Sequence, residues 1–305
     1  MTLIRRIRII KSVKNASQLK FQRKGNGVVP WRCISACGLW SVILFQPINV
    51  LGQDDSGVPS QDLQIGGDER KRYFLIGPMP ENEAPKKGFG LVVVMPGGAG
   101  GADFHPFVKN IFKHALPEGY LVAQPVAVKW TPSQQIVWPT RKNKVKGQKF
   151  STEKFVEAVI ADVRSRHKLD RRRIFTLSWS SSGPAAYAIA LQKKTAVVGS
   201  FIAMSVFKPD YLPTLKRAKG RSFYLFHSKG DRICPYRMAE EAGEALEENG
   251  AFVTLATYEG GHGWRGQVFG NIRDGVRWLE QSVKKAAKKE KSKKKKKKKK
   301  KKSSD

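Results

Sequence analysis

Four serines lie within five positions in the segment TLSWSSSGP, residues 176–184, where an apolar run ends and a glycine follows. Three other apolar runs end in loops with chemically capable residues: the glycine-rich loop 96–103, the segment 228–231 with Asp231, and the segment 259–264 with His262. Serine, histidine and aspartate are the residue types of a nucleophile, its base and the acid that orients the base. The serine cluster is therefore either a nucleophile or a polar turn.

The elements that must position these loops follow from the hydrophobic pattern after residue 71. Several runs are apolar on both faces, which is typical of central strands in a parallel sheet covered by helices. We predict strands at 72–77, 91–95, 120–124, 173–178, 200–205, 222–227 and 252–258, and helices at 104–115, 152–167, 183–192, 236–249 and 265–284. This order indicates an α/β fold with a doubly wound, mostly parallel sheet. Ligands bind such sheets at the carboxyl ends of the strands, where all four loops lie.

Two segments depart from this alternation. Residues 53–71 are polar and rich in Gly, Asp and Gln, which indicates a linker or an edge strand ahead of the domain at 72–283. Residues 130–150 contain two tryptophans, two prolines and a cluster of lysines, and we predict an excursion over the sheet. This excursion either caps the candidate site or leaves it open to a polymer.

The order of glycine loop, serine, aspartate and histidine at strand ends resembles the α/β-hydrolase family over roughly residues 70–280. Within that family the chain looks like the esterases grouped with polyhydroxybutyrate depolymerases, feruloyl esterases and the phospholipase/carboxylesterase type. The resemblance implies an α/β-hydrolase sheet and a catalytic triad of Ser180, Asp231 and His262. It also implies an oxyanion hole formed by backbone amides of Ser181 and of Gly98 or Ala99.

The choice of serine rests on the family's GxSxG turn, which keeps small residues two positions either side of the nucleophile. Ser180 satisfies this rule with Ser178 and Ser182, although both replace glycine. A frame centred on Ser181 puts Trp179 at the crowded first position, and one centred on Ser182 puts Pro184 at the last. A noncatalytic turn is the remaining alternative.

The family resemblance also assigns the other two members of the triad. His262 has glycine on both sides after the last strand and is the expected base. Asp231 is the expected acid, with Asp210 and Glu259 as rivals, because the segment HSKGDRICP resembles the family's acid loop. His227 in that segment is then expected to be structural.

The sequence implies no cofactor and no metal. The glycine-rich loop 96–103 lacks the Lys-Ser/Thr ending of a phosphate-binding loop, and Asp103 stands where a dinucleotide fingerprint needs its third glycine. HExxH patterns and paired CxxC motifs are absent from the sequence.

The net charge of +32 is unevenly distributed along the chain. Residues 284–305 have 15 lysines and two acids, giving +13, and residues 1–52 have nine cations and no acid, giving +9. The difference, 32 − 13 − 9, leaves +10 on residues 53–283. We expect the lysine tail at 284–305 to be disordered, because it has almost nothing apolar to bury. The tail lacks aromatic residues for base stacking, so a specific nucleic acid is not expected. The two interpretations that stay open are a solvated tail with no dedicated partner and a tether to an anionic envelope polymer or lipid.

The N-terminal segment predicts export. A basic leader precedes a mostly apolar stretch, and small residues at Val50 and Gly52 suit cleavage before Gln53 of a signal peptide at 1–52. The alternatives are a membrane anchor at 33–52 and a lipoprotein cysteine at Cys37. Cleavage would leave Cys234 as the one cysteine, so no intramolecular disulfide could form.

These observations give a leading functional hypothesis and two alternatives. The leading one is an exported serine hydrolase that cleaves a small-molecule or polymeric carboxylic ester through an acyl-enzyme. One alternative is a catalytically weak binding protein on the same fold, tethered by its tail, which is suggested by the two replaced elbow glycines. The other is a peptidase or thioesterase that uses the same triad.

Overall fold

In a computed structural model, residues 57–80 and 83–302 are described, with side chains of the last helix described to Lys288 and at Ser292. The expected signal peptide at 1–52 and the alternative anchor at 33–52 lie outside the described residues. Among those that are described, no helix combines the length and apolar character needed to cross a membrane.

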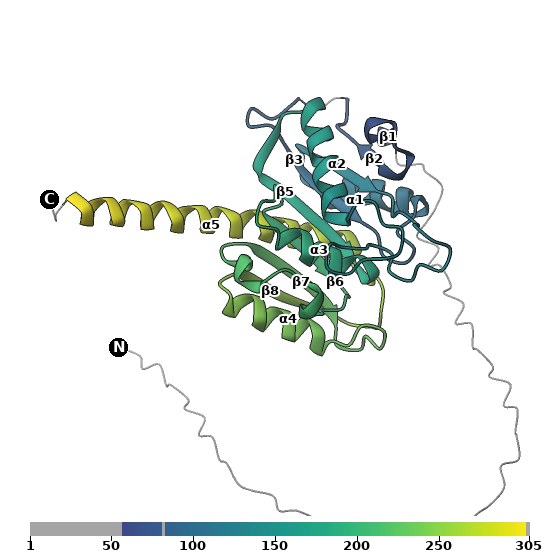
Figure 1. Ribbon diagram of the computed structural model, residues 1–305. Coiled ribbons are helices and arrows are strands. Elements are labelled where there is room, and N and C mark those ends of the chain that lie inside the picture. Colours follow the sequence, from purple (N-terminus) through teal and green to yellow (C-terminus); the bar gives the residue numbers. More distant parts are fainter. Residues whose placement is uncertain (1–56, 81–82, 303–305) are drawn as a thin grey trace, which may run out of the picture. The chain divides into compact units, whose positions relative to one another are not determined.

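One eight-stranded sheet organises the described chain, in the order β1-β2-β4-β3-β5-β6-β7-β8 (Figure 1). β1 pairs antiparallel with β2, and β2 pairs antiparallel with β4. All pairings from β4 to β8 are parallel. The prediction of a doubly wound, mostly parallel sheet is confirmed. Their bounds are β1 (Ser60–Gln64), β2 (Arg72–Ile76), β3 (Phe89–Met95), β4 (Tyr120–Pro125), β5 (Leu169–Trp179), β6 (Gly199–Ala203), β7 (Ser222–Ser228) and β8 (Phe252–Tyr258).

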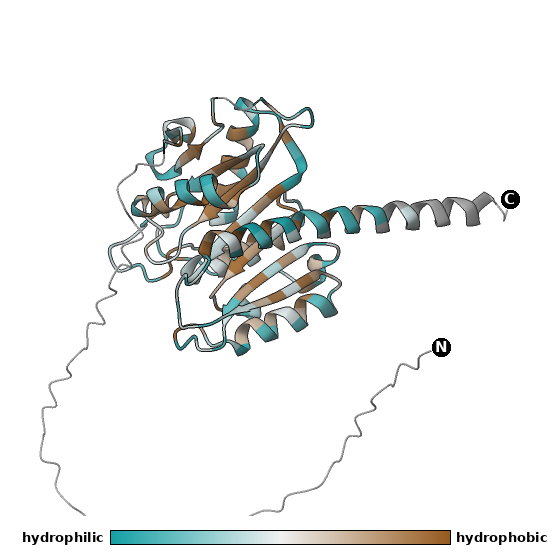
Figure 2. Ribbon diagram, turned by 180° about the vertical axis from the view of Figure 1, so that it is seen from behind, coloured by the Kyte–Doolittle hydropathy of each residue, from teal (hydrophilic) through white to brown (hydrophobic). Residues whose placement is uncertain are grey.

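Helices cover both faces of the sheet, and each face has its own apolar core. Along β3, Leu91 and Val93 belong to one core and Val92 and Val94 to the other, as alternation along a strand requires. The first core includes the buried faces of α2 (Thr152–Arg166), α3 (Gly183–Ala190) and α4 (Arg237–Glu248), and the second those of α1 (His105–Ala115) and α5 (Val268–Lys302). Figure 2 shows the apolar residues gathered on the strands.

The N-terminal polar segment contributes an edge strand, which was one of its two expected roles. β1 lies within residues 53–71 and pairs with β2 from Ser60 opposite Ile76 to Gln64 opposite Arg72. Its Asp62 carboxylate accepts hydrogen bonds from Arg72 Nε at 2.9 Å and from Arg72 Nη2 at 2.7 Å. The sheet therefore begins before the predicted domain start at residue 72.

The last helix differs from the expectation of a disordered tail at 284–305. α5 continues as one helix to Lys302, well past Ser282, the last buried residue among the side chains of this helix that the structure describes. Lysine has a high intrinsic helix propensity, and after Gly275 the helix contains neither glycine nor proline to interrupt it. The tail has few apolar residues in its sequence, but the backbone continues the helical turns of the packed segment.

Candidate active site

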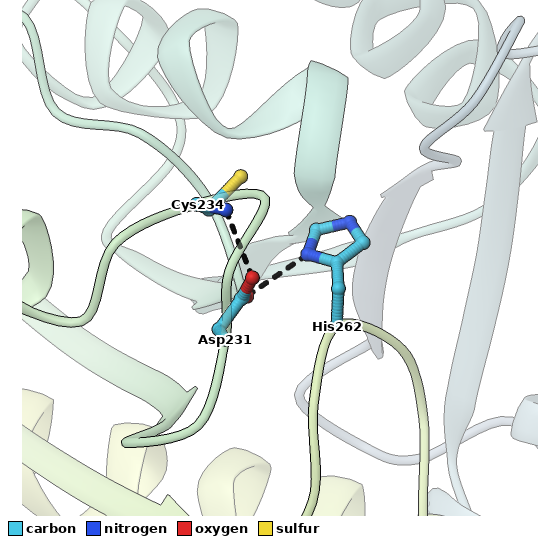
Figure 3. Close-up of side chains that lie close together, drawn as sticks. All are labelled: Asp231, Cys234 and His262. Atoms are coloured by element: carbon cyan, nitrogen blue, oxygen red, sulfur yellow. Dashed lines mark hydrogen bonds and ion pairs between the residues drawn. The ribbon is translucent and has the colours of Figure 1, made fainter. Parts of the chain in front are cut away.

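Three predicted residues meet at the carboxyl edge of the sheet. Ser180 follows β5, Asp231 follows β7 and His262 follows β8. The Ser180 hydroxyl oxygen lies 3.0 Å from His262 Nε2, and His262 Nδ1 lies 2.9 Å from Asp231 Oδ2. Figure 3 shows the Asp231 carboxylate between the His262 ring and the backbone of Cys234. With Nδ1–H donated to the carboxylate, Nε2 is free to accept the serine proton.

Ser180 stands on a strained turn between strand and helix. Its φ is +54°, in the left-handed region that L-residues rarely adopt, whereas Trp179 before it is extended. A short 3-10 turn, Ser180–Ser182, leads directly into α3 at Gly183. This turn exposes the Ser180 hydroxyl to His262 at the head of the helix. Strain of this kind is typical of functional sites.

The two serines that replace the elbow glycines are fully buried and hydrogen-bonded. Ser182 Oγ donates to the Met95 carbonyl oxygen at 2.7 Å and accepts the Trp179 N–H at 3.0 Å. Ser178 Oγ donates to the Phe201 carbonyl oxygen at 3.3 Å. These hydroxyls therefore join β5 to its neighbours instead of crowding the turn.

The close approach that demands glycine occurs one residue later, at Gly183. A Cβ on Gly183 would lie 2.0 Å from Ser205 Oγ and 3.1 Å from Ile202. Ser205 uses that position to donate to the Ser180 carbonyl oxygen at 2.6 Å. Ser205 was not identified from sequence. It follows β6, and only the parallel pairing of β5 with β6 brings it beside the turn.

Met204, next to Ser205, is the other described non-glycine residue with positive φ, at +39°. Its N–H donates to the Phe226 carbonyl oxygen at 2.8 Å, and its sulfur lies 3.8 Å from the Tyr258 hydroxyl. The strained backbone at the end of β6 thus lies beside the strained turn at the end of β5. Both conformations are held by partners from neighbouring strands.

The Asp231 carboxylate is fully buried and fully used. Its Oδ1 accepts the N–H groups of Ile233 at 2.9 Å and Cys234 at 2.8 Å, and its Oδ2 faces His262. The rivals considered from sequence, Asp210 and Glu259, are exposed instead. These hydrogen bonds fix the carboxylate in the orientation that holds the His262 ring.

His227 contacts the same carboxylate. Its Nε2 lies 2.7 Å from the Cys234 carbonyl oxygen and 3.2 Å from Asp231 Oδ2, so Nε2–H is the donor to both acceptors. Burial lowers the pKa of His227, although the Cys234 carbonyl and the Asp231 charge oppose that shift. The neutral ring suits this position, because one N–H is sufficient for both contacts. His227 is therefore structural, as expected, and also supports the acid.

The glycine loop after β3 lies against the serine turn. The Ser181 hydroxyl donates to the Gly98 carbonyl oxygen at 2.9 Å, and Gly98 has a φ of +55°. Gly97 leaves no room for a side chain, since a Cβ there would lie 2.6 Å from the Trp179 ring. The loop that carries Gly98 and Ala99 is thus in contact with the turn that carries Ser180 and Ser181.

Sequence comparison finds neither a matching protein-family model nor a similar curated protein. Among solved structures, the chain is similar to an esterase from Rhizomucor miehei, with 11% identity, a TM-score of 0.56 and coverage of 76% of this chain and 85% of that one. A truncated carbohydrate esterase from gut microbiota is 13% identical, with a TM-score of 0.54 and coverage of 73% of this chain and 96% of that one. An α/β hydrolase from a Medee basin deep-sea metagenome is 13% identical, with a TM-score of 0.52 and coverage of 75% of this chain and 99% of that one.

The chain has the α/β-hydrolase fold. The expected resemblance is confirmed at the level of the fold. Within this hydrolase fold, the strand ends carry the loops with Gly98, Ser180, Asp231 and His262 in the order read from sequence.

One group of side chains in the candidate site has metal-ligand chemistry. Ligand atoms of Asp231, Cys234 and His262 lie within 4.8 Å of one another. Burial, with the Asp231 charge, raises the pKa of the Cys234 thiol to about 12, so the sulfur is a protonated thiol at neutral pH. A metal prefers the thiolate, and Asp231 and His262 already satisfy each other. These residues fit the hydrogen-bonded triad better than a metal centre.

The buried Ser182 hydroxyl should stabilise the elbow. Ser182→Ala removes both the acceptor for the Trp179 N–H and the donor to the Met95 oxygen, so we expect the free energy of unfolding to fall by about 1–3 kcal/mol. Chemical denaturation measures this change. Ser165→Ala, at an exposed helical hydroxyl, is the control and should change stability by less than about 0.5 kcal/mol. Equal stability of the two variants would show that the elbow does not need the hydroxyl.

The buried neutral His227 predicts a pH dependence of stability. Because its pKa is lower in the folded chain than the ordinary value of 6.5, the unfolded chain binds the proton first and stability falls on acidification below that pH. We expect the His227→Gln variant to lose less stability than the wild type between about pH 7 and pH 5, by at most about 1.4 kcal/mol per pH unit. Denaturation curves at several pH values measure the difference. Parallel pH profiles would contradict a neutral buried ring.

Proposed function

We propose that this protein is a serine hydrolase that cleaves carboxylic esters through an acyl-enzyme intermediate. The observation that carries the proposal is the hydrogen-bonded line from Ser180 through His262 to Asp231, with Ser180 on a turn of positive φ. The similarity in fold to solved esterases supports an ester as the substrate.

In the proposed first half-reaction, Ser180 Oγ attacks the ester carbonyl carbon while His262 Nε2 takes the hydroxyl proton. Asp231 keeps Nδ1–H in place and stabilises the imidazolium. The amide of Ser181 and that of Gly98 or Ala99 donate to the developing oxyanion. The bond to the leaving oxygen then breaks, His262 gives the proton to the departing alcohol, and the acyl group remains on Ser180.

The second half-reaction reverses the roles. His262 removes a proton from water, the water oxygen attacks the acyl carbon, and the proton returns to Ser180 Oγ as the acid is released. The Cys234 thiol, buried beside Asp231, is neutral and so places no second negative charge next to the Asp231 carboxylate. The carboxylate is therefore the negative charge that faces the imidazolium of His262.

The alternative of a catalytically weak binding protein rested on the two replaced elbow glycines. Ser178 and Ser182 are hydrogen-bonded between strands, and the tight packing is at Gly183, so these replacements no longer favour it. A peptidase or thioesterase would use the same side chains. Rates on an ester, a thioester and an amide with the same acyl group would rank these three activities.

Replacing the proposed nucleophile tests the function directly. Ser180→Ala should lower kcat on p-nitrophenyl acetate by about 10³-fold or more, because removal of a triad nucleophile has effects of this size or larger. The matched control is Ser181→Ala, which removes a neighbouring hydroxyl but retains the backbone amide and the nucleophile, and it should keep its reaction with a fluorophosphonate. Peptide mapping identifies the labelled serine. Equal turnover by wild type and Ser180→Ala would refute the proposal.

We propose further that the hydrolase is exported and that its C-terminal lysines tether it to an anionic envelope polymer or lipid. The basic leader with its cleavage signal supports export, and the +13 charge of residues 284–305 supports the tether. Lysines neutralise anionic groups and release their counterions, so the contact should weaken as salt rises.

Deletion of residues 284–305 tests the tether. The full chain should sediment with anionic vesicles or acidic polymer at low salt and be released at high salt, whereas the truncated chain should stay in solution. Turnover of p-nitrophenyl acetate should be the same for both chains, since α5 retains its buried residues through Ser282. Equal sedimentation of both chains would exclude the lysine tail as the tether.

A further inference from the structure

The loop at residues 126–151, between β4 and α2, is built against the proposed oxyanion loop. The Trp138 indole N–H donates to the Pro96 carbonyl oxygen at 3.0 Å, and the Ala127 N–H donates to the Gly100 carbonyl oxygen at 2.9 Å. Gly100 has no space for a side chain, because a Cβ would lie 2.6 Å from that of Ala127. We call residues 126–151 the basic loop. It lies at the carboxyl edge of the sheet, beside the site.

Charge is the main feature of this loop. Six cations and no acid occur in it, and the acid-free stretch runs from residue 119 to residue 152. All six side chains are exposed, and in the part of the chain that the structure describes none forms an ion pair. The cations are Lys129, Arg141, Lys142, Lys144, Lys146 and Lys149. By contrast, helical cations such as Lys154 and Arg166 are paired with acids one turn away.

The basic loop is ordered by side-chain amides and not by regular secondary structure. Gln134 accepts the Trp130 N–H at 2.8 Å and donates to the carbonyl oxygen of Ile136 at 2.7 Å. Gln148 donates to the Phe150 carbonyl oxygen at 3.1 Å, and the buried Glu153 accepts the Arg141 N–H at 3.2 Å. Long loops of this kind in compact domains are usually functional. The unpaired charges are therefore displayed on a preorganised surface.

The positive surface continues from the loop onto the neighbouring helices. Arg141 opens onto a groove of about 350 Å³ whose other cations are Lys154, Lys193, Lys194 and Arg217. Two acids also line the groove, but Glu153 is buried and Glu157 is paired with Lys154. Arg141 belongs to both the loop and the groove, so the two together form a basic track that runs from the loop toward the segments that precede β6 and β7.

We propose that this basic track binds an acidic polysaccharide and that the polymer's O-acyl esters are the substrate of the adjoining site. The inference rests on the proposed esterase function and names its substrate class. In the reaction, the bond between the acyl carbon and the sugar oxygen breaks. A water molecule supplies the hydroxyl group of the released acid, and the other proton of that water is gained by the sugar oxygen. The polymer keeps its charges and remains bound to the track.

The surface chemistry favours a glycan over the other polyanions. Among the described residues, the exposed large apolar side chains are Tyr211 and Ile233, which is little for insertion into a lipid surface. The loop aromatics Trp130 and Phe150 pack edge to face with ring centroids 4.9 Å apart, and Arg70 and Lys71 lie over them. Both rings are thus engaged within the protein, and neither is among the exposed large apolar side chains that could serve as stacking platforms for bases.

The test compares two charge-removing variants of the full chain. Lys142, Lys144, Lys146 and Lys149 are changed together to Gln in the first variant. The control changes Lys86, Lys87, Arg171 and Arg172 to Gln, which removes the same charge from exposed positions at or near the amino ends of β3 and β5, the opposite edge of the sheet. The C-terminal lysines are identical in all three proteins, so their contribution cancels.

The substrates are O-acetylated polygalacturonate, O-acetylated glucomannan of equal acetyl content, and p-nitrophenyl acetate. At about 50 mM salt, the first variant should lose about tenfold or more in kcat/KM on the acidic polymer, chiefly through KM, because several counterion-releasing contacts are removed. Its rates on the neutral polymer and the small ester should change less than about twofold. The control should match the wild type, and wild-type preference for the acidic polymer should decrease as salt rises.

The outcomes separate this inference from the proposed function. The inference alone would be overturned if Ser180-dependent turnover of p-nitrophenyl acetate is observed but the enzyme shows no preference for the acidic polymer. The same holds if the four loop substitutions have no effect on that preference. Absence of Ser180-dependent turnover would overturn the esterase function itself. Stronger competition by duplex DNA or by phosphatidylserine vesicles than by polygalacturonate would overturn the choice of a polysaccharide.

Discussion

The backbone of Ser180 is the constraint on which the rest of the site depends. A φ of +54° at a non-glycine residue is unfavourable by about 1–3 kcal/mol, and it persists only where surrounding contacts determine it. Those contacts come from three strands: Ser182 joins β5 to the end of β3, and Ser205 at the end of β6 holds the Ser180 carbonyl. The parallel sheet thus supplies the support that allows the serine to face His262.

A second constraint is the burial of a negative charge. The Asp231 carboxylate has no contact with solvent, so it must be satisfied by donors, and it has two backbone amides and two imidazoles around it. The amides face one oxygen and the rings face the other. This division fixes the carboxylate plane, and through His262 it determines where the proton-accepting nitrogen lies relative to Ser180.

Sequence was sufficient for features that depend on local pattern. Apolar runs located every strand from β2 to β8 within a few residues, and their order placed Ser180, Asp231 and His262 at one edge of the sheet. The frame of small residues at positions 178 and 182 singles out Ser180 in the cluster, and in the structure it is the Ser180 hydroxyl that faces His262 Nε2. Ser205 and the strained Met204 could not be found, since their partners are distant in sequence and are brought together only by strand pairing. The helical path of α5 through the lysines does not follow from the charge of the tail, because it depends on the helix propensity of lysine and on continuation of the packed helix.

The hydroxyl of Ser182 bears on how such an elbow could change during evolution. A glycine at position 182 would relieve no steric conflict, because the close contact is between Gly183 and Ser205. The same exchange would leave the Met95 oxygen and the Trp179 N–H without the group that now joins them. A single serine-to-glycine step toward the commoner turn would therefore be destabilising, and the exchange would require a compensating change on β3 or β6. The serine-rich turn is accordingly a second stable sequence for this elbow. A change from serine to glycine would pass through a variant that is less stable than either sequence with its own matched neighbours.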